Sequence, residues 1–146
     1  MKIFPATFCL VLCLTATQGL AQQGQPGAHF IENWDIDGDG TVTAEEAAER
    51  RGDLFVTFDS DEDGFLDGEE YGQFDAARQA DMESQPGFGR GGMKRVADGL
   101  VREHNDSDGD GKVSREEFIG NAAAWVAVID SNGDGVVTSA DFGPAR

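Results

Sequence analysis

Apolar residues recur at helical spacing in four stretches of the chain, and two of these stretches, 47–58 and 118–129, match position for position. Residues three and four apart lie on one face of a helix, so the spacing predicts four helices with a buried side. The positions on these faces are Ala47, Arg51, Leu54, Phe55 and Phe58; Tyr71, Phe74, Arg78 and Met82; Met93, Val96, Leu100 and Val101; and Phe118, Ala122, Trp125, Val126 and Ile129.

Two further features of the pattern set the boundaries of these helices. Residues 84–92 are rich in glycine and include Pro86, which predicts a flexible linker before a helix resumes at Met93. After residue 141 only Phe142 to Arg146 remain, so we expect a final helix of one turn at most. The predicted fold class is all-α.

The first 21 residues form a separate segment. Lys2 precedes an apolar run of about 14 residues, and Gly19 and Ala21 place small residues before a cleavage point, which is typical of a secretory signal peptide. A membrane anchor is the alternative, but the run is shorter than the roughly 20 residues that a spanning helix needs. We therefore expect residues 22–146 to be exported, to the periplasm or to the extracellular space, with no membrane span. Both cysteines, Cys9 and Cys13, lie in the leader, so no disulfide is expected in the mature chain.

The charge of the chain is strongly acidic, with 28 acidic and 11 basic residues and a net charge of −17. Such a chain is repelled by nucleic acids and by anionic membranes, so neither is an expected partner. Acidic composition alone could indicate disorder. Here, however, more than half of the acidic residues fall at fixed spacings within four short segments.

These segments are 35–46, 59–70, 106–117 and 130–141, each twelve residues long. The first three fit the pattern D-x-D-x-D-G-x₅-E at every position, and the fourth has Asn132 at position 3 and Asp141 at position 12. They resemble the calcium-binding loops of the EF-hand family. The resemblance implies one domain over residues 22–146, built from helix–loop–helix repeats with four calcium loops and short β-bridges between paired loops.

The chemistry of Ca²⁺ explains the spacing, because this ion takes about seven oxygen ligands at roughly 2.3–2.6 Å. Positions 1, 3 and 5 offer side-chain oxygens, position 6 needs the positive φ of glycine, position 7 gives a backbone carbonyl, and position 12 closes the site with a carboxylate. The implied ligands are Asp35, Asp37, Asp39, Thr41 and Glu46; Asp59, Asp61, Asp63, Phe65 and Glu70; Asp106, Asp108, Asp110, Lys112 and Glu117; and Asp130, Asn132, Asp134, Val136 and Asp141.

The fourth loop is expected to bind more weakly than the others. Asn132 removes one charge, and Asp141 is one methylene shorter than glutamate, which strains bidentate closure and favours Mg²⁺ relatively more. We therefore expect up to four Ca²⁺, with a weaker and Mg²⁺-tolerant fourth site. The alternative is that these acidic, glycine-rich turns are merely solvated loops, or degenerate EF-hands kept for their shape.

The lengths between the loops predict how they pair. Residues 47–58 and 118–129 are each long enough for one helix shared by two loops, which would place neighbouring loops at opposite ends of that helix. Loop 59–70 should then pair with loop 106–117, and loop 35–46 with loop 130–141, with the shared helices antiparallel. A break at Gly52-Asp53 would instead pair the loops in chain order.

One position departs from the repeat. Apolar residues stand one and four places before the other loops, but Asn105 and Arg102 occupy those places before loop 106–117. We expect the helix that enters this loop to end early.

The function predicted from these features is calcium-ion binding by an exported protein that acts as a buffer or sensor. The alternative is a calcium-stabilised interaction module with a dedicated protein partner. No nucleophile and base are arranged for catalysis, so an enzyme is not expected. His29 and His104 are expected to be structural or exposed, and Trp34 and Trp125 to lie in the core.

Overall fold

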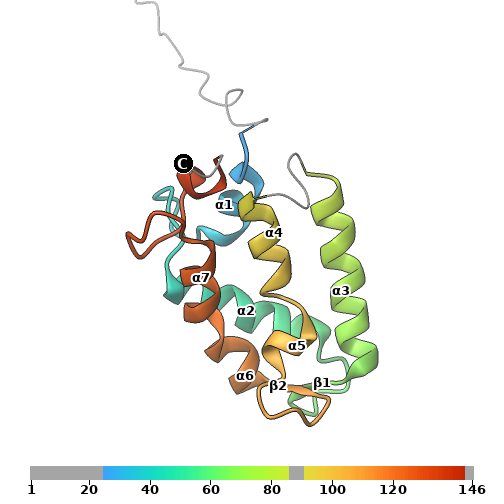
Figure 1. The fold of residues 1–146 in the computed structure, drawn as a ribbon. Helices are drawn as coiled ribbons and strands as arrows, with labels where there is room; N and C mark the ends of the chain where they lie inside the picture. The colour runs from blue at the N-terminus through green and yellow to red at the C-terminus, as the bar shows by residue number, and fades with distance from the viewer. Residues whose placement is uncertain (1–24, 86–90, 144–146) are drawn as a thin grey trace, which may run out of the picture.

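The computed structural model describes residues 25–85 and 91–143, and helices make up most of it (Figure 1). The predicted all-α class is confirmed, with one very small sheet. In chain order the elements are α1 (Ala28–Trp34), α2 (Ala44–Phe58), β1 (Phe65–Leu66), α3 (Gly68–Glu83), α4 (Gly91–Asp98), α5 (Arg102–Asn105), β2 (Val113–Ser114), α6 (Arg115–Gly120), α7 (Ala122–Ile129) and the 3₁₀ helix η1 (Ser139–Phe142).

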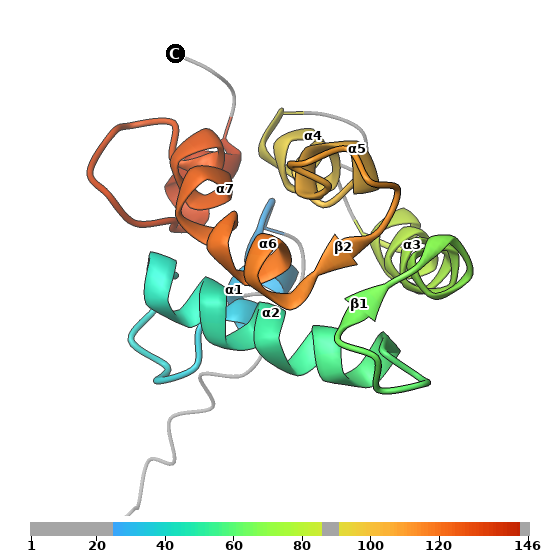
Figure 2. The ribbon, with the colours of Figure 1, turned by 90° about the horizontal axis from the view of Figure 1, so that it is seen from below.

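The predicted pairing of the loops is confirmed by two antiparallel contacts. β1 pairs with β2 (Figure 2), with Leu66 opposite Val113, and an isolated bridge joins Val42 to Val137. The first contact joins loop 59–70 to loop 106–117, and the second joins loop 35–46 to loop 130–141. Leu66, Val113, Val42 and Val137 are all buried, so each pair of loops contributes to the core.

The shared helices run antiparallel between these two loop pairs. α2 is continuous through Gly52 and Asp53, so the alternative break does not occur there. The second shared segment differs from the expected single helix, because α6 ends at Gly120 and α7 begins at Ala122. Asn121 lies between them with a ψ of −3°, while the amide of Trp125 still bonds to its carbonyl, so the axis is interrupted and the chain direction is kept.

The core is formed by the apolar faces that the sequence predicts. Phe55, Tyr71, Phe74 and Phe118 pack in edge and tilted ring contacts with centroids 5.4 to 6.3 Å apart. At the other end, Trp34 and Trp125 pack against each other and against Phe30. Phe142 joins this second group, which connects η1, the last described element, to α1, the first.

The helix that enters loop 106–117 ends early, as expected. α4 stops at Asp98 and the chain turns before the four residues of α5. Asn105 is nonetheless fully buried, and its side chain donates to the Tyr71 hydroxyl and to the Val101 carbonyl. A polar network therefore replaces the apolar contact that the other entering helices make.

The ends of the chain and the linker agree with the sequence only in part. The last element is a single 3₁₀ turn, as predicted, but α4 begins at Gly91 rather than at Met93. Glycine at position 92 permits this, because a Cβ there would lie 2.6 Å from the Phe142 ring. The proposed leader, 1–21, and linker residues 86–90 lie outside the described residues. None of the described helices combines the length and apolar character needed to cross a bilayer.

Candidate calcium sites

The first carboxylate of each loop folds the loop around itself. Asp35 accepts hydrogen bonds from the amides of Gly38 and Gly40, at 2.7 and 2.8 Å. Asp106 and Asp130 accept from the equivalent amides of their own loops. The turn that brings these amides inward needs a left-handed residue at position 6, where all four glycines have φ between 84° and 91°.

The position-12 carboxylate closes each loop from the other side. One oxygen of Glu46 accepts from the amide of Ile36 at 2.8 Å, and the other accepts from the amide of Thr43 at 2.9 Å. Glu70 and Glu117 make the corresponding contacts in their loops. Each closing carboxylate therefore spans from position 2 to position 9, across the space that an ion would occupy.

Asp141 reaches the same partners although its side chain is shorter. It accepts from the amide of Ser131 at 2.9 Å and from that of Thr138 at 2.8 Å. The exit element here is the tight 3₁₀ turn η1 rather than an α-helix, and Asp141 is almost fully buried. The sequence predicts a last element of one turn at most, but it does not predict that this turn is a 3₁₀ helix.

Position 9 has a role that the sequence reasoning missed, because it supplies the N-cap of the exit element. Thr43, Asp67, Ser114 and Thr138 each form a capping box with the residue three places on. The signal was visible in the sequence as Ser, Thr or Asp followed three residues later by Glu or Asp. The closing carboxylate is thus a helix cap as well as a candidate ligand.

Hydrogen bonds keep these closing carboxylates acidic. The amide of Asp67 is the main cause that lowers the pKa of Glu70, with further contacts from Ser60. The amide of Ser114 likewise lowers the pKa of Glu117. Burial alone would raise the pKa of Asp141, but the bonds from Thr138 and Ser131 outweigh it and the pKa is lowered. All three groups are ionised at neutral pH and are suited to a cation.

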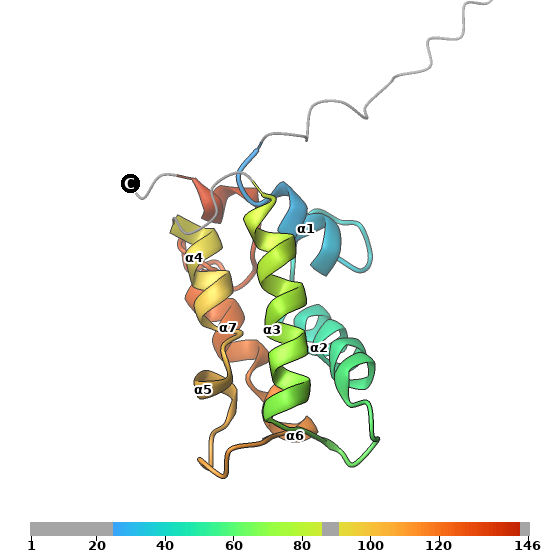
Figure 3. The ribbon, with the colours of Figure 1, turned by 90° about the vertical axis from the view of Figure 1, so that its right-hand side faces the viewer.

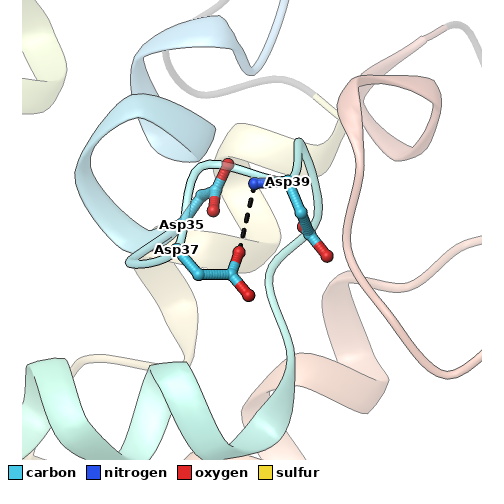
Figure 4. A group of neighbouring side chains, drawn as sticks. All are labelled: Asp35, Asp37 and Asp39. Atoms are coloured by element: carbon cyan, nitrogen blue, oxygen red, sulfur yellow. Dashed lines mark hydrogen bonds between the residues drawn. The ribbon is translucent and has the colours of Figure 1, made fainter.

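The acidic oxygens converge in three of the loops. One oxygen from each of Asp35, Asp37 and Asp39 lies within 4.8 Å of the others (Figure 4). The same holds for Asp59, Asp61 and Glu70, and for Asp106, Asp108 and Glu117. Ligands about 2.4 Å from a central Ca²⁺ lie at most about 4.8 Å apart, so the clusters fit this ion. Loop 130–141 forms no such acidic trio, since Asn132 stands at position 3.

The residues at positions 5 and 7 are hydrogen-bonded to each other in every loop, but the position-5 carboxylate belongs to the acidic trio only in loop 35–46. The amides of Thr41, Phe65, Lys112 and Val136 donate to the position-5 carboxylates of Asp39, Asp63, Asp110 and Asp134. These contacts hold the backbone of position 7 close to the position-5 carboxylate. Position 7 is the residue whose backbone carbonyl is the expected ligand. Asp63 and Asp110 lie outside the two acidic trios of their own loops.

A lysine contacts one of the candidate ligands from the paired loop. The Lys112 ammonium lies 3.3 Å from a carboxylate oxygen of Asp63 and 5.4 Å from the centre of the Phe65 ring. The hydrogen bond to Asp63 raises the pKa of Lys112. A positive charge therefore already faces loop 59–70 from loop 106–117.

The two histidines lie outside the loops. His29 pairs with Asp81 at 2.9 Å, and His104 contacts the carbonyl of Asp98. Neither belongs to an acidic cluster, which agrees with the structural interpretation from the sequence.

Comparison with known proteins gives one family. The EF hand family model matches the chain at two places, residues 52–75 and 106–119, which contain loop 59–70 and loop 106–117. No curated protein matches the chain. The matches, together with the helical architecture and the paired loops, show an all-α EF-hand fold, and with the acidic clusters they support calcium binding.

Proposed function

We propose that this chain is an exported EF-hand protein that binds up to four calcium ions and acts as a calcium buffer or sensor. The observation that carries the proposal is the convergence of three acidic oxygens within 4.8 Å in each of three loops. Such groups repel one another, and a divalent cation of the right size removes that repulsion. The EF hand matches at two of these three loops support the same ion.

The fourth loop is proposed as a weaker site that also tolerates Mg²⁺. Asp141 closes the loop through the same amide contacts as the glutamates, so the site has the required shape. It has fewer charges, however, and its closing side chain is shorter. Mg²⁺ prefers octahedral ligation and fewer carboxylates, which suits this donor set relatively better.

Export rests on the leader, whose apolar run and small residues before position 22 are typical of a signal peptide. Both cysteines would be removed with it. Bound calcium would then provide the stability that a small exported domain often takes from disulfides.

The second candidate function, a calcium-stabilised interaction module, has one specific observation in its favour. A cavity of about 460 Å³ lies between α1, α2, α3 and α4. Its lining includes Met82 and Met93, together with Phe58, Phe74 and Leu100. Flexible methionine side chains suit the docking of an apolar group from a partner.

A calcium titration of residues 22–146 followed by two-dimensional ¹H–¹⁵N NMR tests the main proposal. The amides of Gly40, Gly64, Gly111 and Gly135 report one loop each. The first three should shift at lower calcium than Gly135, and magnesium should move Gly135 most. Spectra that calcium leaves unchanged would refute the proposal.

Two substitutions test the ranking of the sites. Glu70→Gln should remove one strong site, whereas Asp141→Asn should change total calcium binding least, as measured by calorimetry. A hydrophobic dye added to the same samples distinguishes a buffer from the other two roles: a rise in fluorescence with calcium supports a sensor or an interaction module, and an unchanged signal supports a buffer.

A further inference from the structure

Arg51 carries a charge in the middle of the protein without an acidic partner. Its side chain on α2 is fully buried, and no carboxylate in the described part of the chain forms an ion pair with it. The guanidinium lies between the rings of Phe118 and Trp125, at 5.2 and 4.8 Å from their centres. Burial lowers its pKa to about 10, so it stays charged at neutral pH. A buried charge is costly, and an apolar residue of this size would serve stability as well.

The hydrogen bonds of Arg51 join the two flanks of one calcium loop. Its Nη1 donates to the side-chain oxygen of Asn105 at 2.8 Å and to the carbonyl of Phe118 at 2.7 Å. Asn105 directly precedes the first residue of loop 106–117, and Phe118 directly follows the last. One nitrogen atom thus fixes the distance between the two ends of this loop.

Further contacts keep Asn105 in place for this role. Its amide nitrogen donates to the Tyr71 hydroxyl at 3.1 Å and to the Val101 carbonyl at 3.0 Å. The Tyr71 hydroxyl in turn donates to the carbonyl of Leu100. The oxygen of Asn105 is therefore left to face Arg51.

Arg95 makes the same kind of contact at the adjacent loop. Its Nη2, from α4, donates to the carbonyl of Ile129 at 3.3 Å and to that of Asp141 at 2.9 Å. Ile129 precedes the first residue of loop 130–141, and Asp141 is the last residue of that loop. Two arginines from different helices therefore bridge the ends of the two C-terminal loops, one arginine to each loop.

We propose that Arg51 and Arg95 are positioning residues that hold loops 106–117 and 130–141 closed for a divalent cation. A cation is bound by the first and the last side chain of its loop together, so fixing the flanks lowers the ordering cost of binding. The proposal rests on calcium binding as the function. Through Arg51, the helix that connects loops 35–46 and 59–70, α2, also supports loop 106–117.

The test is a calcium titration of the full chain without its leader, read at Gly111 and Gly135 by NMR. Arg51→Met should raise the half-saturation concentration at Gly111 about tenfold, the scale seen when groups behind a metal ligand are lost. Arg95→Met should do the same at Gly135. In each variant, the half-saturation concentration at the other glycine should change much less. Arg50→Met is the matched control, since Arg50 neighbours Arg51 on α2 and, among the described residues, forms an ion pair only with Asp53.

The outcomes separate positioning from mere stability. Equal changes of the half-saturation concentration at both glycines in both variants, or no change at either, would overturn the proposal while leaving calcium binding intact. If Arg51→Met fails to fold, Arg51→Lys and Arg95→Met decide the question in the same way. Lysine keeps the charge, but its side chain is one atom shorter and lacks the second nitrogen that contacts the Gly99 carbonyl, so Arg51→Lys should still weaken calcium binding at Gly111 selectively. A wild-type chain whose glycines ignore calcium would refute the proposed function itself, and this inference with it.

Discussion

At the scale of single residues, the contact between Lys112 and Asp63 affects how loop 59–70 meets a cation. The ammonium is exposed and lies 3.3 Å from an oxygen that calcium is expected to use. An incoming ion must displace or tolerate this charge. We therefore expect Lys112 of the paired loop to lower the calcium affinity of loop 59–70, although that loop has the largest number of acidic groups.

Replacing this charge gives the first prediction. Lys112→Gln should tighten calcium binding at Gly64 by about two- to fivefold at low salt, the scale of an exposed ion pair. The gain should shrink at high salt, because exposed charges are screened. NMR titration measures both. Lys94→Gln is the control, since Lys94 pairs with Asp98 on α4 and forms no ion pair with a loop carboxylate in the described part of the chain. A gain that persists undiminished in high salt would contradict this explanation.

The left-handed backbone conformation of Glu62 has a conformational cost that can be measured. This residue has a φ of 59° at position 4 of its loop, where the other three loops have glycine. A left-handed conformation costs a residue with a Cβ about 1–2 kcal/mol, partly offset by the entropy that glycine loses on folding.

We therefore expect Glu62→Gly to stabilise the calcium-free protein by about 0.5–1 kcal/mol. Chemical denaturation measures this change. Gly109→Ala, at the same position of loop 106–117 and with φ of 74°, should have the opposite sign. Destabilisation by Glu62→Gly would show that the strain is not significant.

At the scale of the elements, some glycines are required because two segments pack closely there, and others lie in open space. Gly120 ends α6 with open space around it, whereas a Cβ on Gly99 would lie 2.1 Å from the Trp125 ring. The first glycine only weakens its helix. The second lets the turn after α4 approach α7, which carries Trp125.

This difference predicts opposite effects of the same substitution. Gly120→Ala should raise the free energy of unfolding by about 0.5–1 kcal/mol through helix propensity. Gly99→Ala should lower it by about 1–3 kcal/mol, because the core must shift to accept the methyl group. Thermal denaturation with calcium present measures both. Gly72→Ala, in the open middle of α3, should behave like Gly120→Ala. Equal stabilities for Gly99→Ala and Gly120→Ala would be incompatible with the close contact.

At the scale of the whole molecule, charge and architecture are linked. The net charge is −17, and the paired loops that carry the acidic residues lie at the two ends of the shared helices. Figure 3 shows one such pair, loops 59–70 and 106–117, at the lower end of the domain. Without a cation, each end of the domain holds two loops of repelling carboxylates. The metal should therefore contribute strongly to the stability of the fold.

A chelator should accordingly lower the melting temperature by well over ~10 °C. A free calcium concentration that greatly exceeds the dissociation constant adds several kcal/mol to the free energy of unfolding, and the chelator removes this contribution. Added sodium chloride should recover part of the loss by screening the carboxylates. Circular dichroism during heating measures both effects. Identical melting curves with calcium and with chelator would reject a stabilising role for the ion.

The sequence was sufficient wherever a local rule governs the structure. The ligand spacing located the four loops, the three-and-four spacing located the buried faces, and the twelve residues between loops gave the pairing of Leu66 with Val113 and Val42 with Val137. These features depend on chain length, helix period and the geometry of one loop. They are therefore encoded in neighbouring residues.

Tertiary structure alone decided how the exceptions to these rules are used. Arg51 and Asn105 each occupy an interior position that the pattern reserves for an apolar residue, and they lie 54 residues apart in the chain. Their hydrogen bond exists only because α2 packs beside the end of α5. The contact of Arg95 with the carbonyl of Asp141 in loop 130–141 likewise joins segments that lie 46 residues apart in the chain. Periodicity and spacing describe one segment at a time, whereas a buried polar group is satisfied by whichever segment the fold brings beside it.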